Sequence, residues 1–268
     1  MKKIVLRGSL IVVLFISAWQ ALSLIHWIRV LGIERFQQES LEQLSDLFWN
    51  TLSGTQQEVD DPVVTAPIDS ILDKICTANG LDRSIVKAHL VLSEEVNACA
   101  LPGGHLVVFS ALIKDCKSAN ELAGVLAHEV GHIEKGHVTK KLIREFGTSV
   151  LVSVSSGKAD LPMIKEMLGS LTGSAYDRAF EREADLTAVT YLNTSGIDPA
   201  GFADFMDRVS KEEPSTFSWM ASHPDAKERA AYIRAKRSEN SSLYVDVISD
   251  SVWTAWRSTV DSLSFQEK

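Results

Sequence analysis

The sequence contains few cysteines, namely Cys76, Cys99 and Cys116, and no two of them form a C-x-x-C pair. Zinc sites made of thiolates usually rely on such pairs, so the spacing argues against a zinc finger or ribbon. In an oxidising compartment one disulfide could form and one thiol would be left over, and the sequence does not say which two would pair. Three small, semi-buried residues are the simpler interpretation.

Clusters of lysine and arginine are also missing, and the net charge is −8 at pH 7. Proteins that bind nucleic acids normally present a basic patch to the phosphates, so we expect no nucleic-acid partner. Internal repeats and low-complexity segments are absent from the sequence as well. The 268 residues, 45% of them hydrophobic, are enough for one sizeable domain with a real core, or for two small ones.

A long apolar run lies at the N-terminus, over 8–28, after three basic residues. It just reaches the roughly 20 residues that a membrane-spanning helix needs. A cleaved signal peptide has the same features, but the chain stays apolar further on, which favours an uncleaved anchor over 1–31. The basic start places the N-terminus in the cytoplasm. We therefore expect a single-pass protein of the bacterial inner membrane that faces the periplasm or, if the segment is cleaved, a soluble periplasmic protein.

The spacing of apolar residues predicts a chain dominated by helices, with two strands near its middle. An amphipathic helix is expected over 33–54, followed by an acidic linker that reaches Pro62. The other expected helices lie at 68–78, from 119 to about 137, in pieces over 140–171, at 175–192, at 199–209 and up to about 237; the expected strands lie at 88–96 and 105–109. A loop is expected over 211–224, and the last segment predicts a strand at 243–248 and a short helix, with no assigned role.

The segment from His128 to His132 is an H-E-x-x-H motif on a helix that Ser118 is expected to cap. Histidines four residues apart share one face of a helix, so both rings can reach one tetrahedral metal ion. A zinc ion there would lower the pKa of a water molecule, and Glu129 would take its proton as general base when the water attacks a peptide carbonyl. Gly131 would let another segment approach closely. Two solvated histidines are the bland alternative.

A catalytic zinc ion needs a third protein ligand and an open fourth position. His137 would point away from the motif if the helix continued to it, so we expect it to be a neighbour and not a ligand. Glu181, on a separate helix, is the better candidate, and Asp185, one turn later, could accept the N–H of a ligating ring. On their own these acids are more typical of a charged, solvated helix face, to which we assign Glu183.

Four ordered motifs between about 68 and 237 resemble those of the zinc peptidases that include the HtpX heat-shock protease, the CAAX prenyl protease and the Oma-type proteases. They are N-A-x-A-x-P-G-G at 97–104, H-E-x-x-H-x-x-x-x-H at 128–137, R-x-x-E-x-E-A-D at 178–185, and His223-Pro224 followed by Arg229. The resemblance implies an α+β fold, a mainly helical zincin-like metallopeptidase domain with a small sheet. This domain would span 63–237, after the anchor 1–31 and a connection over 32–62, with 238–268 as a tail.

The resemblance also implies roles for particular residues. His128, His132 and Glu181 would bind one zinc ion, with Asp185 and Arg229 supporting them from behind. His223 would be catalytic, as a hydrogen-bond donor to the oxyanion. The strand after P-G-G would be the edge strand that flanks the active-site helix and pairs with the substrate, through Leu106, Val107, Val108 and Phe109.

These features together predict a zinc-dependent metalloendopeptidase that cleaves unfolded or damaged membrane and envelope proteins, for protein quality control. Its single anchor resembles that of the envelope and Oma-type members, and no prenyl substrate is implied. The alternatives are a metal-bound chaperone or assembly factor that does not cleave its clients, for which Glu129 would be unnecessary, and a structural zinc protein, for which a fourth ligand would be needed. The helical region 147–173 is long enough to act as a lid over the cleft.

Overall fold

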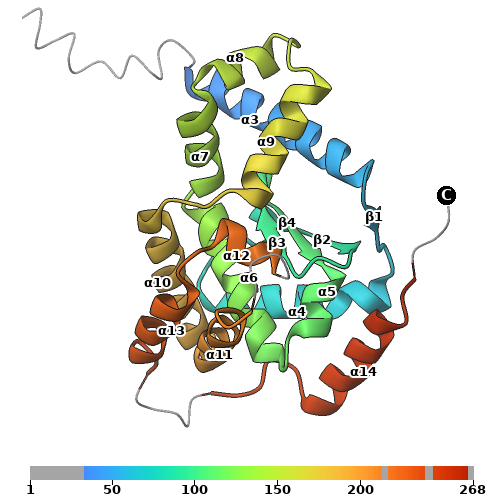
Figure 1. Cartoon of the computed structure of the whole chain (residues 1–268), viewed down its shortest axis with the longest axis vertical. Coiled ribbons are helices and arrows are strands. Elements are labelled where there is room, and N and C mark those ends of the chain that lie inside the picture. The colour runs from blue at the N-terminus through green and yellow to red at the C-terminus, as the bar shows by residue number, and fades with distance from the viewer. Residues whose placement is uncertain (1–32, 213–216, 239–243, 265–268) are drawn as a thin grey trace, which may run out of the picture.

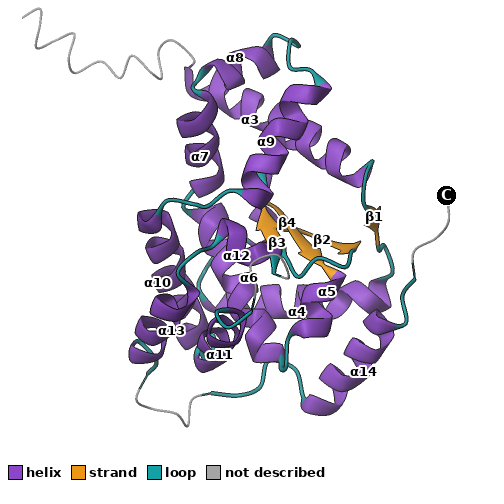
Figure 2. Cartoon of the chain, in the orientation of Figure 1, coloured by secondary structure: helices purple, strands orange, loops and turns teal. Residues whose placement is uncertain are grey.

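The computed structural model describes residues 33–212, 217–238 and 244–264. This part of the chain is mainly helical with one small mixed sheet, so it has the α+β architecture that the sequence predicts (Figures 1 and 2). The predicted anchor over 1–31 lies outside the described residues. Among the helices that are described, none combines the length and the hydropathy needed to cross a bilayer.

The sheet has four strands in the order β1-β2-β4-β3. β2 (Lys87–Leu92) and β4 (His105–Phe109) pair in parallel at its centre, whereas β1 (Gln57–Glu58) and β3 (Ala98–Ala100) are antiparallel edges. The prediction that Leu106, Val107, Val108 and Phe109 form an edge strand was therefore wrong, because β4 has a partner on each side. The true edge beside the active-site helix is β3, whose short run of small, fully buried residues gives no alternating pattern to detect.

The register of β3 determines which of its backbone groups face away from the sheet. Leu101 donates its N–H to the carbonyl of His105 at 2.8 Å, and Phe109 donates to the carbonyl of Asn97 at 3.1 Å. In an antiparallel pair the hydrogen-bonded residues alternate, so Ala98 and Ala100 direct their N–H and C=O groups away from β4. This edge lies against α6.

Helix α6 (Ala119–Glu134) carries the H-E-x-x-H motif and begins as the sequence predicts, with the Ser118 side chain accepting the N–H of Glu121 at 3.2 Å. Gly136 ends the helical run with a φ of 64°, and α7 (His137–Phe146) follows in a new direction. Helix α10 (Arg178–Thr194) packs across α6 at Gly131, where a Cβ atom would stand 3.2 Å from the carbonyl oxygen of Ala184. The glycine therefore permits the close contact between the two helices.

The main core lies on one face of the sheet. Most of its helices are α4 (Pro62–Ala78), α5 (Ser110–Asp115), α6, α10, α11 (Ala200–Val209), α13 (Ala226–Ala235) and α14 (Asp250–Asp261), and the side chain of Trp219 also belongs to it. Trp253 and Trp256 of α14 are buried in this core, and the indole N–H of Trp256 donates to the carbonyl of Val64 at 2.8 Å. The C-terminal helix is thus a part of the main core. The predicted strand at 243–248 is not found over the residues of it that are described, 244–248.

A second core covers the other face of the sheet, where Val91, Cys99, Val107 and Phe109 meet apolar side chains of four further helices. These helices are α3 (Ile33–Ser53), α7, α8 (Ser149–Ser155) and α9 (Leu161–Gly173), which gather at one end of the molecule (Figure 1). The predicted loop over 211–224 contains a short helix, α12 (Ser218–Ser222), which packs against α9. Two short 3-10 helices lie in connections to the sheet. Arg83–Ile85 lies between α4 and β2, and Pro102–Gly104 lies between β3 and β4.

Candidate metal centre

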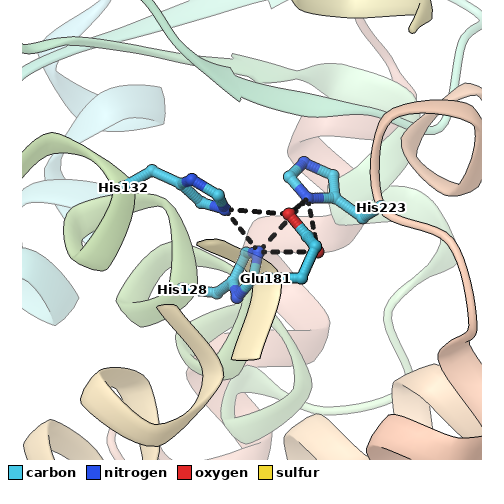
Figure 3. Close-up of side chains that lie close together, drawn as sticks. All are labelled: His128, His132, Glu181 and His223. Atoms are coloured by element: carbon cyan, nitrogen blue, oxygen red, sulfur yellow. Dashed lines mark hydrogen bonds and ion pairs between the residues drawn. The ribbon is translucent and has the colours of Figure 1, made fainter. Parts of the chain in front are cut away.

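Four buried side chains from three parts of the fold converge on one point (Figure 3). His128 and His132 come from α6, Glu181 from α10, and His223 directly follows α12; one donor atom of each lies within 4.8 Å of all the others. The Nε2 atoms of the two α6 histidines are 3.0 Å apart, and Nδ1 of His223 lies 2.9 Å from Oε1 of Glu181. Three imidazole nitrogens and a carboxylate at these separations fit a tetrahedral zinc ion. His223, expected as an oxyanion donor, thus stands among the metal donors.

The support behind His128 is ionic and fully buried. Its Nδ1 lies 2.9 Å from Oδ1 of Asp185. Arg229 donates a bidentate hydrogen bond to the two carboxylate oxygens of Asp185, at 2.7 and 2.8 Å, and the hydroxyl of Tyr232 contacts the same carboxylate. The third guanidinium nitrogen of Arg229, Nη1, contacts Glu181. Burial would raise the pKa of Asp185, but Arg229 and His128 outweigh it and hold that pKa well below its usual range.

The charge of Glu181 has a similar origin. Burial acts to raise the pKa of this carboxyl, but the neighbouring His223 and Arg229 and the hydrogen bond to His132 outweigh burial and hold the pKa well below its ordinary value. The side chain therefore stays an anion in a buried position, which suits a ligand of a divalent cation.

The support behind His132 is different and reaches the surface. Nδ1 of His132 lies 3.1 Å from Nδ1 of His137, whose Nε2 lies 3.2 Å from Oε2 of Glu183. The left-handed turn at Gly136 reorients the chain before His137, so this ring meets His132 where a continued helix would have carried it away. Phe180 stacks on the His137 ring with centroids 4.5 Å apart and an interplanar angle of 12°. Burial lowers the pKa of His137 to about 4, so the ring is neutral.

Glu129 lies beside the four donors, with both of its carboxylate oxygens bound. The backbone N–H of Ala100 donates to Oε2 at 3.1 Å, and the indole N–H of Trp219 donates to Oε1 at 3.2 Å. Burial raises the pKa of Glu129 to about 7, although His132 and these hydrogen bonds act to lower it. The base predicted from the motif thus lies between the metal donors and the edge of β3 that pairs with no other strand of the sheet.

The segment around α12 closes the site from the side of that edge. The backbone N–H of Trp219 donates to the carbonyl of Val96 at 3.3 Å, and its indole stacks on His223 with centroids 4.6 Å apart. Tyr176 completes the cover, because its N–H binds the carbonyl of Ser222 at 2.9 Å and its ring lies 4.5 Å from that of His132. Sequence reasoning missed both aromatic residues, since neither belongs to a motif with spacing that indicates chemistry.

This constellation of a metal-binding helix, a carboxylate donor from a second helix and a buried base is typical of a metallopeptidase. The model of peptidase family M48 matches residues 62–237, about two thirds of the chain, and the chain belongs to this family. It is accordingly a metalloendopeptidase with a metal cofactor, and the donor chemistry indicates zinc.

Individual relatives agree with this assignment. Metalloprotease LoiP of Escherichia coli (strain K12) is 34% identical over 221 residues, which cover 77% of this chain and 86% of LoiP. Metalloprotease YcaL of the same organism is 32% identical over 173 residues, covering 61% of this chain and 67% of YcaL. The beta-barrel assembly-enhancing protease of that strain is 25% identical over 183 residues, which cover 62% of this chain but only 37% of the relative.

Proposed function

We propose that this metalloendopeptidase cleaves unfolded or damaged proteins of the cell envelope, with zinc as its metal and Glu129 as general base. The observation that carries this proposal is the position of Glu129, buried next to the four donors and held by hydrogen bonds at both oxygens. When bound, a zinc ion would supply an acidified water and polarise the scissile carbonyl. Glu129 would accept the proton of the attacking water and pass it to the leaving amine. A site that only binds would need no such base.

The outer edge of β3, which pairs with no other strand of the sheet, supports the preference for unfolded substrates. Ala98 and Ala100 present backbone groups along the side of the sheet that faces Glu129. An extended peptide that pairs with this edge would be held by its main chain, with little regard to its sequence, and its scissile bond would lie next to the base. Folded proteins rarely offer a free extended segment, so the geometry favours unfolded chains.

The described arrangement is, in this proposal, a closed state of the enzyme. His223 would supply a fourth protein donor to a zinc ion bound here, in the position that a catalytic site keeps open for water, and the four donors are at most 3% exposed. Trp219, four residues earlier, binds both Glu129 and the edge carbonyl of Val96. A movement of the segment 217–223 would therefore free the metal position, the base and the strand edge together.

The experiment that tests the proposed activity is degradation of unfolded casein by the full-length protein in detergent. Glu129→Gln keeps the size of the side chain but removes the base, so we expect cleavage to fall by roughly 10²–10⁴-fold while the zinc content stays unchanged. A chelator should abolish cleavage, and added zinc should restore it. Equal cleavage by the wild type and Glu129→Gln would contradict the proposal, and zinc binding without any cleavage would favour a structural site with four ligands.

We also propose that residues 1–31 anchor the protein in the bacterial inner membrane with the catalytic domain in the periplasm. The apolar run after a basic start supports this placement, as does the name of one relative, a beta-barrel assembly-enhancing protease. The measurement is fractionation of cells with alkaline extraction of membranes. An anchored chain stays in the membrane pellet, whereas a cleaved chain is released with the periplasmic proteins.

A further inference from the structure

We propose that Glu183 is a positioning residue that fixes the tautomer of His137 and thereby holds His132 in its metal-binding orientation. The inference rests on the metal site of the proposed function, but it concerns the retention of the metal and not the cleavage step. Glu183 lies at the surface, about half exposed, with its Oε2 3.2 Å from Nε2 of His137. His137 in turn is fully buried, with its Nδ1 3.1 Å from Nδ1 of His132.

Metal binding by His132 determines which groups donate and which accept hydrogen bonds along the row formed by His132, His137 and Glu183. His132 faces Glu181 and His128 through its Nε2, so a metal ion bound there requires the proton of the neutral ring to sit on Nδ1. That N–H needs an acceptor, and Nδ1 of His137 is in place to accept it. His137 can accept on Nδ1 only when its own proton is on Nε2, where the carboxylate of Glu183 receives it.

Removal of the carboxylate would leave the tautomer of His137 undetermined. The other tautomer would place two N–H groups face to face across 3.1 Å, which would push His132 away from its metal-binding position. The His137 ring cannot easily turn to avoid this conflict, because Phe180 stacks on it and the chain is fixed by the tight turn at Gly136. The carboxylate of Glu183 is therefore the group that keeps the proton of His137 on Nε2, so that Nδ1 of His137 can accept the N–H of His132.

The two histidines of the motif are thus supported in unlike ways. His128 contacts the buried carboxylate of Asp185, which is paired with Arg229. His132 instead contacts the neutral ring of His137, whose hydrogen-bond acceptor, Glu183, lies at the surface. Glu183 lies at the surface, so a substitution there leaves the core packing intact. Such a substitution can therefore change the metal affinity without altering any of the four metal donors.

The test measures the zinc affinity of the full-length chain by competition with a chromogenic chelator at neutral pH, in the Glu129→Gln background so that self-cleavage plays no part. Glu183→Ala should weaken zinc binding by about 10-fold, the low end of the effect of such supporting residues. Glu183→Gln should retain most of the affinity, since its amide oxygen can still accept the N–H of His137. Glu166→Ala, an exposed acid on α9, is the matched control and should have no effect.

The comparison of alanine with glutamine separates the hydrogen bond from charge, because both variants remove the same negative charge. Equal weakening by the two would overturn the tautomer argument, and so would an unchanged affinity in Glu183→Ala. The melting temperature of the metal-free Glu183→Ala protein should equal that of its parent, and a lower one would indicate a merely structural role. Tight zinc binding by a wild-type chain that fails to cleave casein would refute the proposed function while leaving this inference intact.

Discussion

Arg229 is the residue on which the buried charges of the site depend most. Its guanidinium contacts both Asp185 and Glu181, and its side chain is 5% exposed. A buried carboxylate that loses its cation is left uncompensated, which is far more costly than the loss of a pair in solvent.

Arg229→Ala should therefore lower the free energy of unfolding of the metal-free protein by about 3–5 kcal/mol. The measurement is denaturant unfolding followed by circular dichroism. Arg178→Ala is the control, because it removes an ion pair with Asp225 in which the arginine side chain is 86% exposed, and it should change stability little. Similar losses in both variants would show that burial does not set the strength of these pairs.

Among single residues, the sequence allowed us to predict those site residues that are placed together by their spacing along one helix. His128 and His132 could be paired because a helix places residues four apart on one face, and the position of Glu129 follows from theirs. Glu181 was the better candidate for the third ligand, but the pattern of 181–185 on its own favours a solvated helix face, and the resemblance supported the choice of Glu181 over Glu183. The contact between His137 and Glu183 could not be foreseen, since it depends on the change of direction at Gly136.

Among the elements, the segment that carries α12 has the greatest consequence for activity. It brings Trp219 and His223 to the site from a stretch that reads as a loop, and five helical residues give too little periodicity to detect. The short strand β3 escaped detection for a similar reason, so the edge was assigned to the wrong strand.

If His223 blocks the open metal position, His223→Ala should retain zinc on the three remaining donors and cleave casein several-fold faster than the wild type. Casein turnover and zinc content measured on the same preparations provide the check. A large loss of turnover with zinc still bound would instead assign His223 to stabilisation of the oxyanion. Ser218→Ala on the same segment, which leaves Trp219 and His223 in place, is the control.

The stability of the contact between α3 and the sheet, where Trp49 meets His89 and His105, should depend on pH. Trp49 of α3 stacks on His89 with centroids 3.5 Å apart, and His89 lies between Glu58 and His105, 2.8 Å from each. Burial, with a smaller contribution from His89 and Lys87, lowers the pKa of His105 to about 4. Between about pH 6.5 and 4 the unfolded chain binds a proton at this residue that the folded chain does not, so acidification favours unfolding in that window.

His105→Phe keeps a ring beside Trp49 but cannot titrate. The difference in unfolding free energy between the wild type and this variant should therefore shift against the wild type, by on the order of 2 kcal/mol, as the pH falls from 6.5 to 4. Denaturant titrations at several pH values measure it. A difference that stays constant across the window would contradict the assignment of a neutral, buried His105.

Over the whole molecule, the metal centre exists only because three distant segments meet. Helix α6 is fixed against α10 at Gly131, and the residues after α12 are brought in by contacts with α9, Val96 and Tyr176. Most helices followed from periodicity and the fold class from the resemblance, whereas the meeting of these segments depends on tertiary packing that no local pattern records. The same holds for α14, expected as part of a tail without an assigned role but buried in the main core.

The convergence of four donors on one ion is most directly tested by zinc K-edge X-ray absorption of the purified full-length protein. One zinc ion per chain should show nitrogen and oxygen neighbours at about 2.0–2.2 Å, with the scattering pattern of imidazole rings. In His223→Ala this pattern should weaken by one ring. Sulfur neighbours at about 2.3 Å, or a spectrum that His223→Ala and Glu181→Ala both leave unchanged, would contradict the site described for this chain.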